Sequence, residues 1–279
     1  MLVSIVSFLH ALPCPSIHIS YSYSYACTEG SACVGLRSST HCVLGALKRS
    51  VSELSAHQKK ILEIDSHVGI GIAGLTADAR TLAKWMRSEC LNHRYVYGTD
   101  MPSGRLLAGL ADRHQRTTQT YVRRPYGVGL LVAACDKTGP HLYQTCPSGN
   151  VYEYYASAVG ARSQSGRTYL EKHCGNDADS EQAQAPFADA SLDDLIMHAL
   201  RALAGCVSTD DKEARAKGNA EGLTRDNGSV GVVGRDQAFR LIEGAELQPY
   251  LDRLELEGGN AAGAGAGDDD GNDGGAMET

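Results

Sequence analysis

The sequence lacks several patterns that identify common kinds of functional site. Its nine cysteines include no Cys-x-x-Cys pair, which excludes a zinc ribbon and a thioredoxin-type redox site. The ten histidines contain no i, i+4 pair, so their spacing predicts no metal site. Gly-x-Ser-x-Gly and His-Glu-x-x-His are also absent, and with them the signatures of many serine hydrolases and zinc proteases.

Positive charge is not in excess either. The chain has 26 Lys and Arg against 33 Asp and Glu, which gives a net charge of −7. Residues 258–279 alone carry −5, from Asp268, Asp269, Asp270, Asp273 and Glu278 without any basic residue, and this leaves −2 for the rest. Nucleic-acid binding requires a basic stripe that this balance does not offer, so no nucleic-acid partner is expected.

Charge is missing altogether from residues 1–28, which pass from the apolar run Leu2 to Leu12 into the repeat SYSYSY. Eleven residues are too few to span a bilayer, and no membrane contact is expected. The positively charged start and the cleavage site of a signal peptide are absent. We expect residues 1–29 to be an atypical leader without a fold, and residues 1–28 to be missing from the protein in cells.

The rest of the composition is ordinary. Apolar residues make up 42% and charged residues 21% of 279 residues, which fits one substantial globular domain. Single cysteines within apolar runs, such as Cys135, are typical of buried thiols in a reducing, intracellular compartment. Residues 258–279 are mostly Gly, Ala and Asp and are expected to form a flexible acidic tail.

Four antiparallel hairpins are predicted, because short polar turns join runs rich in β-forming residues. Their strands are Cys33–Arg37 with His41–Leu47, Lys60–Ile64 with Val68–Ala73 around the turn Asp65-Ser66, Gly127–Cys135 with His141–Thr145, and Val230–Val233 with Ala238–Ile242. The long apolar run from Gly127 is expected to begin a second sheet.

Helices are predicted between the hairpins from apolar residues at helical spacing. They run from Thr76, as N-cap, to about His93, from Ser103 to about Arg116, over Arg162–Cys174, from the capping box at Ser191 to Leu203, and from Glu246 to about Glu255. Residues 175–186 are expected to have weak structure. Helix pairs inserted between hairpins must lie on the outer faces of the sheets, so the expected fold is α+β, a four-layer αββα sandwich.

Gly69 to Gly74 match Gly-x-Gly-x-x-Gly, the pattern of a dinucleotide loop. The acidic residue at the required distance, Glu89, falls within the predicted helix instead of at the end of a second parallel strand. Alternating glycines are also typical of a strand that packs closely on another sheet. A nucleotide-binding module is therefore the weaker alternative. The calcium-loop-like run from Asp268 has Asp273 where glycine is required, which argues against a calcium site.

Three segments in fixed order, AGLTADAR, RRPYGVGLL and GARSQSGRTYLE, carry a resemblance to a known family. The chain resembles the α-type subunits of the 20S proteasome core particle over residues 30–257. This resemblance implies the αββα sandwich of the N-terminal-nucleophile hydrolases, in agreement with the hairpins and helices predicted above.

The resemblance also implies that the chain is not an enzyme. Catalytic relatives use an N-terminal Thr, an Asp and a Lys, because a hydroxyl needs a base to become a nucleophile. The matching positions here are Ser31, which lies inside the chain, Leu47 and Lys60, so that only the lysine is retained. No catalytic residue, metal or cofactor is expected. An autonomous hydrolase of the same fold is the alternative.

The implied role is structural: ring assembly, gating and activator docking in ubiquitin-dependent protein degradation, in the cytoplasm and nucleus. The implied partners are neighbouring α subunits of a heptameric ring, β-ring subunits, and activators or a regulatory particle. Activator tails bind between α subunits, and Gly30, Lys60 and Leu75 match that pocket. Considered alone, Lys60 would be a solvated lysine at a strand start. Residues 1–29 lack the Tyr-Asp and Gln-Val-Glu-Tyr-Ala motifs that order the gate in α subunits.

Overall fold

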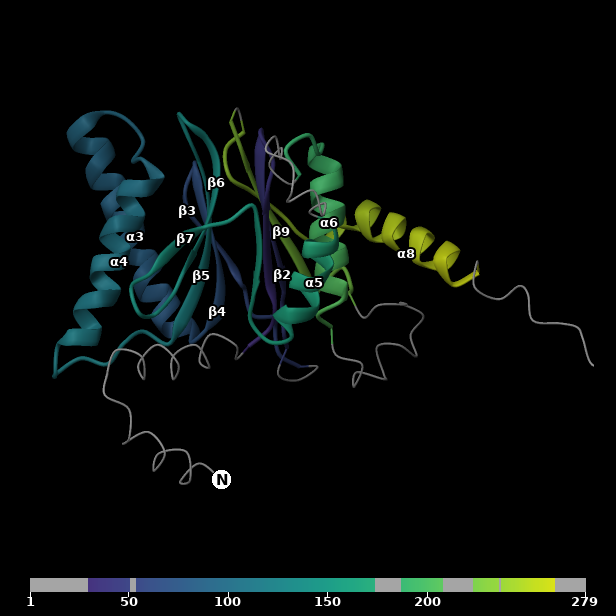
Figure 1. The fold of residues 1–279 in the computed structure, drawn as a ribbon, viewed down its shortest axis with the longest axis horizontal. Helices are drawn as coiled ribbons and strands as arrows, with labels where there is room; N and C mark the ends of the chain where they lie inside the picture. Colours follow the sequence, from purple (N-terminus) through teal and green to yellow (C-terminus); the bar gives the residue numbers. More distant parts are fainter. Residues whose placement is uncertain (1–29, 51–53, 174–186, 208–222, 236, 264–279) are drawn as a thin grey trace, which may run out of the picture.

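The computed structural model describes residues 30–50, 54–173, 187–207, 223–235 and 237–263. Two five-stranded sheets pack face to face, and helices cover both outer faces (Figure 1). The strand orders are β10-β9-β2-β1-β8 and β3-β4-β5-β6-β7, with all neighbouring strands antiparallel. The predicted α+β sandwich of four layers, αββα, is confirmed.

The first sheet consists of β1 (Cys33–Arg37), β2 (His41–Leu47), β8 (Ala156–Val159), β9 (Gly228–Gly234) and β10 (Arg240–Ile242). The second consists of β3 (Ile61–Asp65), β4 (Val68–Gly74), β5 (Val128–Asp136), β6 (Gly139–Thr145) and β7 (Val151–Glu153). All four predicted hairpins are present, with ends that differ by one or two residues.

Helices α3 (Thr76–Tyr97) and α4 (Ser103–Gln119) cover the second sheet, and α5 (Ser163–His173) and α6 (Leu192–Ala204) cover the first. A 3-10 turn, η2 (Gly244–Glu246), precedes α8 (Gln248–Gly263), which packs against α6. The predicted apolar stripe of α6 is buried, and the Ser191 hydroxyl accepts a hydrogen bond from Asp194 N at 3.3 Å. The helix therefore begins where the capping box predicts.

The prediction that a second sheet begins at Gly127 is wrong. Strand β5 pairs along its length with β4, so it extends the sheet that β3 and β4 have already started. The α3–α4 hairpin returns the chain to the same sheet, and the crossing between the two sheets occurs earlier, between β2 and β3. The local sequence does not indicate which sheet β5 joins, because that depends on where the α3–α4 pair packs.

Strands β7 and β8 were not predicted from the sequence. They have three and four residues and lie at sheet edges, where there is too little length for an alternating pattern. The β3–β4 turn consists of Ser66 and His67 instead of Asp65 and Ser66, because Asp65 still pairs with Val68.

Helix boundaries differ from prediction mainly at the ends. Leu75, not Thr76, is the N-cap of α3, and the Thr76 hydroxyl instead accepts a hydrogen bond from Gln58 Nε2 at 2.7 Å. Helix α3 continues past His93 to Tyr97. Helix α8 continues to Gly263, so the first residues of the predicted tail after residue 257 are helical.

The predicted leader, residues 175–186 and the acidic run from Asp268 lie outside the described residues. Five described cysteines are buried as predicted, Cys146 is half-buried, and all six are free thiols. No helix in the described part of the chain combines the length and hydrophobicity needed to cross a membrane.

Candidate functional site

The three residues predicted for an activator pocket lie together at one end of the sandwich, where β3 begins and β4 ends. A Cβ atom on Gly30 would lie 3.3 Å from Lys60 Nζ and 3.8 Å from Gly74 N. Leu75 follows Gly74 as the N-cap of α3 and is 53% exposed. The backbone of Lys60 is held by β4, because its carbonyl accepts a hydrogen bond from Ile72 N at 3.0 Å.

The Lys60 side chain is buried, with only 4% of the residue exposed. Burial lowers the pKa of its ammonium, the thiol of Cys33 opposes this effect, and the positive charge of Arg49 adds to it. No ion pair to Lys60 occurs among the described residues. The interpretation of Lys60 as a solvated lysine is therefore wrong: it is a desolvated cation without a carboxylate partner in this part of the chain.

Gly30 keeps the backbone open beside this ammonium. Its φ of +93° lies in the left-handed region that side chains rarely adopt, and its carbonyl accepts a hydrogen bond from Ala161 N at 2.9 Å. Any larger residue would be strained and would crowd Nζ. Glycine at this position thus allows the backbone to lie close to the Lys60 ammonium.

The positions that match the catalytic relatives do not form a catalytic site. Ser31 is buried inside the chain, and its hydroxyl has no hydrogen-bond partner among the described residues. Leu47 is fixed to Ala32 by a backbone hydrogen bond of 3.0 Å and brings an apolar side chain where a carboxylate is needed. Of the three positions only Lys60 can ionise, so the Ser31 hydroxyl has no base assembled around it.

The glycines at positions 69 and 71 serve sheet packing. They lie inside β4, which is paired on both sides, instead of in a loop. A Cβ atom on Gly69 would lie 2.0 Å from Phe239 Cε2, and one on Gly71 would lie 2.3 Å from Cys33 Sγ. The strand interpretation is confirmed, and the dinucleotide loop is excluded because its geometry needs a turn before a helix.

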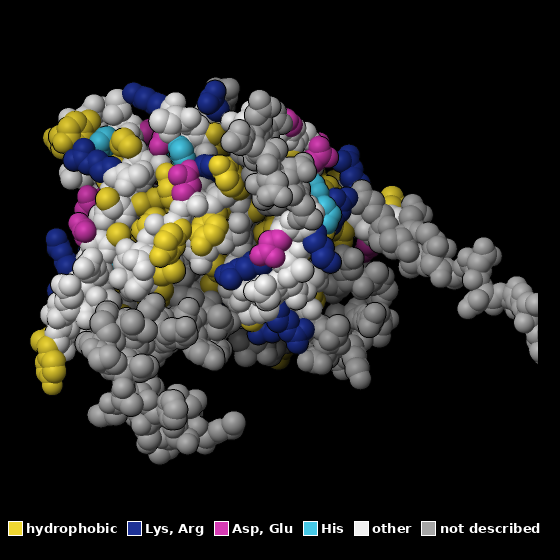
Figure 2. All heavy atoms as spheres, in the orientation of Figure 1, with side chains coloured by type: hydrophobic (Ala, Val, Ile, Leu, Met, Phe, Trp, Pro, Cys, Tyr) yellow, Lys and Arg dark blue, Asp and Glu magenta, His cyan; other side chains and the backbone are white. Residues whose placement is uncertain are grey.

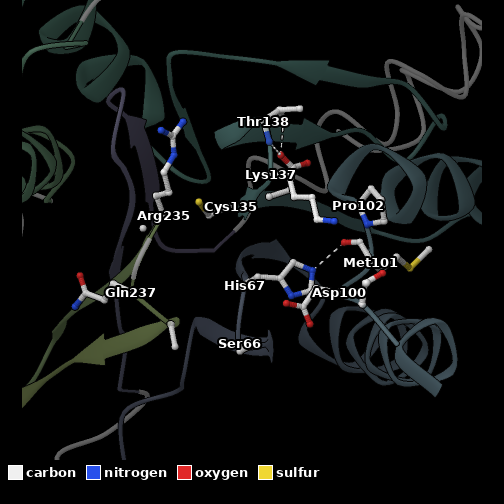
Figure 3. A pocket seen from close by; sticks show the side chains of 14 residues that line it. Ser66, His67, Asp100, Met101, Pro102, Cys135, Lys137, Thr138, Arg235 and Gln237 are labelled. Carbon is white, nitrogen blue, oxygen red and sulfur yellow. Dashed lines mark hydrogen bonds between the residues drawn. The ribbon is translucent and has the colours of Figure 1, made fainter. Parts of the chain in front are cut away.

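The opposite end of the sandwich contains a pocket of about 860 Å³ that the sequence did not predict (Figure 3). Four connections line it: the β3–β4 turn, the α3–α4 connection, the β5–β6 turn and the β9–β10 turn. Its polar lining residues come from positions as distant as His67, Asp100 and Arg235, so no local motif could have identified it.

Exposed apolar side chains gather at both ends of the α3–α4 layer and over β7 (Figure 2). At the ends of the helices they are Leu91, Tyr95, Val96, Tyr97, Tyr121 and Val122, and near β7 they are Tyr152, Tyr154 and Tyr155. Patches of this kind are typical of surfaces that contact other proteins.

Comparison with known proteins agrees with this architecture. The family model described as "Proteasome subunit" matches residues 27–215. The chain is 48% identical over 246 residues to proteasome subunit alpha type-1 of Dictyostelium discoideum, which covers 88% of this chain and 91% of the relative. It is 44% identical to proteasome subunit alpha type-1 of Drosophila melanogaster, over 80% of this chain and 74% of that one.

A third relative, the probable proteasome subunit alpha type-6 of Schizosaccharomyces pombe, is 43% identical over 85% of this chain and 80% of its own length. Identities this high over most of both chains, together with the αββα sandwich and the lost catalytic positions, lead to one assignment. The chain belongs to the proteasome subunit family and is one of its α-type members.

Proposed function

We propose that this structural, non-catalytic α-type subunit receives the C-terminal tail of a proteasome activator at the end of the sandwich where Gly30, Lys60 and Leu75 lie. The observation that carries the proposal is the buried ammonium of Lys60, which has no ion pair among the described residues. An uncompensated buried charge is costly, and an incoming carboxylate would offset that cost. A terminal carboxylate is the peptide group best suited to pair with it.

The other two residues suit the same ligand. Gly30 has no side chain, so a carboxylate can approach Nζ along its backbone. Leu75 is half exposed at the N-cap of α3 and offers an apolar contact to the residues that precede the carboxylate. Charge therefore holds the end of the tail, and apolar contact holds the segment before it.

The wider role proposed here is that of a wall of the α ring in ubiquitin-dependent protein degradation, in the cytoplasm and nucleus. Its partners would be neighbouring α subunits of a heptameric ring, β-ring subunits and activators. The exposed tyrosines and apolar residues on the α3–α4 layer and near β7 support such contacts. The buried free thiols fit a reducing compartment.

The activator site is tested by Lys60→Ala in assembled particles. A charge-assisted hydrogen bond of about 1.5–3 kcal/mol is removed, so the affinity for a single activator-tail peptide should fall by about ten- to a hundred-fold. Lys60→Met keeps most of the side-chain volume without the charge and should lose a similar factor. Lys59→Ala, which alters the exposed neighbouring lysine, should leave the affinity unchanged.

A monovalent peptide is required because a multivalent activator would be held by other pockets of the ring. The peptide should carry a photocrosslinker, so that its position beside this subunit is established independently of affinity. Equal affinities for wild type and Lys60→Met, with the crosslink on this subunit, would remove Lys60 from the site.

A further inference from the structure

The pocket at the end of the sandwich opposite Lys60 contains a cluster of metal-ligand type. Asp65 and His67 stand at the β3–β4 turn, and Asp100 belongs to the α3–α4 connection. One ligand atom from each residue lies within 4.8 Å of the other two. Figure 3 shows His67 and Asp100 next to each other in the wall of the pocket.

The single hydrogen bond of the His67 ring defines its tautomer. Nε2 lies 2.9 Å from the Met101 carbonyl oxygen, which can only accept, so Nε2 carries the proton and donates. In the neutral ring Nδ1 then presents a lone pair. The residue is only 8% exposed, and Nδ1 is buried without a hydrogen-bond partner in the described chain. Metal-binding histidines typically donate the other ring N–H to a carbonyl in this manner.

The carboxylates have oxygens available for the same position. Arg94 Nη2 donates to Asp65 Oδ1 at 2.5 Å and to Asp100 Oδ1 at 2.9 Å, and Arg94 Nε lies 3.2 Å from Asp100 Oδ1. Ser66 N also donates to Asp65 Oδ1, at 2.7 Å. The other oxygen of Asp65, Oδ2, lies 3.8 Å from His67 Nδ1. Two carboxylates therefore share one guanidinium and retain a net negative charge.

We propose that Asp65, His67 and Asp100 bind a zinc ion through Nδ1 and one oxygen of each carboxylate. One imidazole nitrogen and two carboxylate oxygens suit zinc, whereas calcium and magnesium prefer oxygen ligands alone. Three protein ligands leave a fourth position, for water, on the side of the pocket that His67 and Asp100 line.

Arg94 competes with this ion for the same carboxylates. Its side chain is 44% exposed, so the guanidinium can move into solvent when a divalent cation takes its place. The competition predicts the direction of one effect: removal of Arg94 should strengthen zinc binding, although it removes three hydrogen bonds from the native cluster.

The test uses proteasome particles that carry either the wild-type chain or a variant, stripped with a chelator and titrated with zinc alone. Wild-type particles should bind one more zinc ion per copy of this chain than His67→Gln or Asp100→Asn particles. The loss of a direct ligand should weaken that site by at least about 100-fold, since outer-shell changes alone cost about 10- to 100-fold. Arg94→Gln should tighten it by about ten-fold or more.

Matched controls are His173→Gln and Asp112→Asn, which remove the same chemical groups from exposed positions on other surfaces and should change nothing. The Asp100 side chain is 56% exposed, so Asp100→Asn should fold and assemble normally. This variant therefore still tests the zinc site if His67→Gln particles fail to assemble. X-ray absorption at the zinc edge should show nitrogen and oxygen ligands only.

Two results would overturn the proposal. Equal zinc binding by wild-type and Asp100→Asn particles would show that the cluster binds no zinc and that its carboxylates pair only with Arg94. Sulfur in the zinc shell would assign the ion to a thiol, such as that of Cys135 in the same pocket, instead of to His67.

Discussion

At the scale of single residues, the close packing of the two sheets depends on glycines, which have no side chain to separate the layers. Gly71 lies in β4 directly against Cys33 of the other sheet. A strand in which glycines alternate with large side chains can pack its backbone closely against a neighbouring sheet. This packing explains the glycine pattern that resembles a nucleotide loop.

Gly71→Ala should lower the free energy of unfolding by about 1–3 kcal/mol, because its Cβ would lie 2.3 Å from Cys33 Sγ and force a shift in a packed core. Urea unfolding of the purified chain measures the change. Gly104→Ala in α4, where nothing lies within 4 Å, is the control and should not destabilise the chain, since alanine favours a helix over glycine by up to about 1 kcal/mol. The second substitution Cys33→Ala should restore part of the loss, and strict additivity of the two variants would contradict the contact.

At the scale of elements, buried polar side chains join helices to hairpins. Asp136, at the end of β5, accepts hydrogen bonds from Ser103 Oγ of α4 at 2.8 Å and from Thr138 N at 2.9 Å. Burial alone would raise the pKa of Asp136, but the hydrogen bonds from Thr138 and Ser103 outweigh it and lower the pKa to about 2. The β5–β6 turn and the start of α4 are thereby fixed to each other.

The lowered pKa of Asp136 predicts a specific pH dependence. The unfolded carboxyl titrates near 3.8, so its contribution of about 2 kcal/mol is fully present above that pH and is lost as the pH falls towards about 2. Ser103→Ala should remove about 1 kcal/mol at pH 7 and almost nothing near pH 2. Chemical unfolding at both pH values checks this.

Ser88→Ala is the matched control for Ser103→Ala, since its hydroxyl bonds only within α3 and is exposed. It should change stability little at either pH. A loss at Ser103→Ala that is the same at pH 7 and near pH 2 would show that the serine acts through packing and not through Asp136.

At the scale of the whole molecule, the isolated chain should associate with itself. The apolar residues at the ends of the α3–α4 layer and the tyrosines near β7 are exposed in a single copy. Interfaces of permanent complexes are typically large and hydrophobic, so these surfaces are unfavourable in water when left uncovered. Sedimentation velocity of the full chain should show species larger than a monomer.

The double variant Tyr121→Ser, Val122→Ser should reduce that association, because both side chains are almost fully exposed. A double variant at two polar exposed positions, Lys84→Ser and Arg87→Ser, provides the comparison. A wild-type chain that sediments as a single monomer across concentrations would contradict the prediction.

Much of this protein could be predicted from the sequence by itself. Apolar periodicity and turns predict the hairpins and the helices, and the capping box at Ser191 predicts the start of α6, because these signals lie within a few neighbouring residues. The loss of catalytic function is also implied by the family resemblance, since Leu47 stands where the catalytic relatives have a carboxylate.

Other properties are decided only by the tertiary structure. Lys60 is buried because β4 and the segment at Gly30 close around it, and a lysine at a strand start gives no sign of this. The placement of β5 beside β4 depends on how the α3–α4 hairpin docks. The zinc cluster proposed here joins Asp65 and His67 to Asp100, which comes from a different connection. Such contacts join residues distant in the sequence, and they form only when packing of the whole chain brings the ends of its elements together.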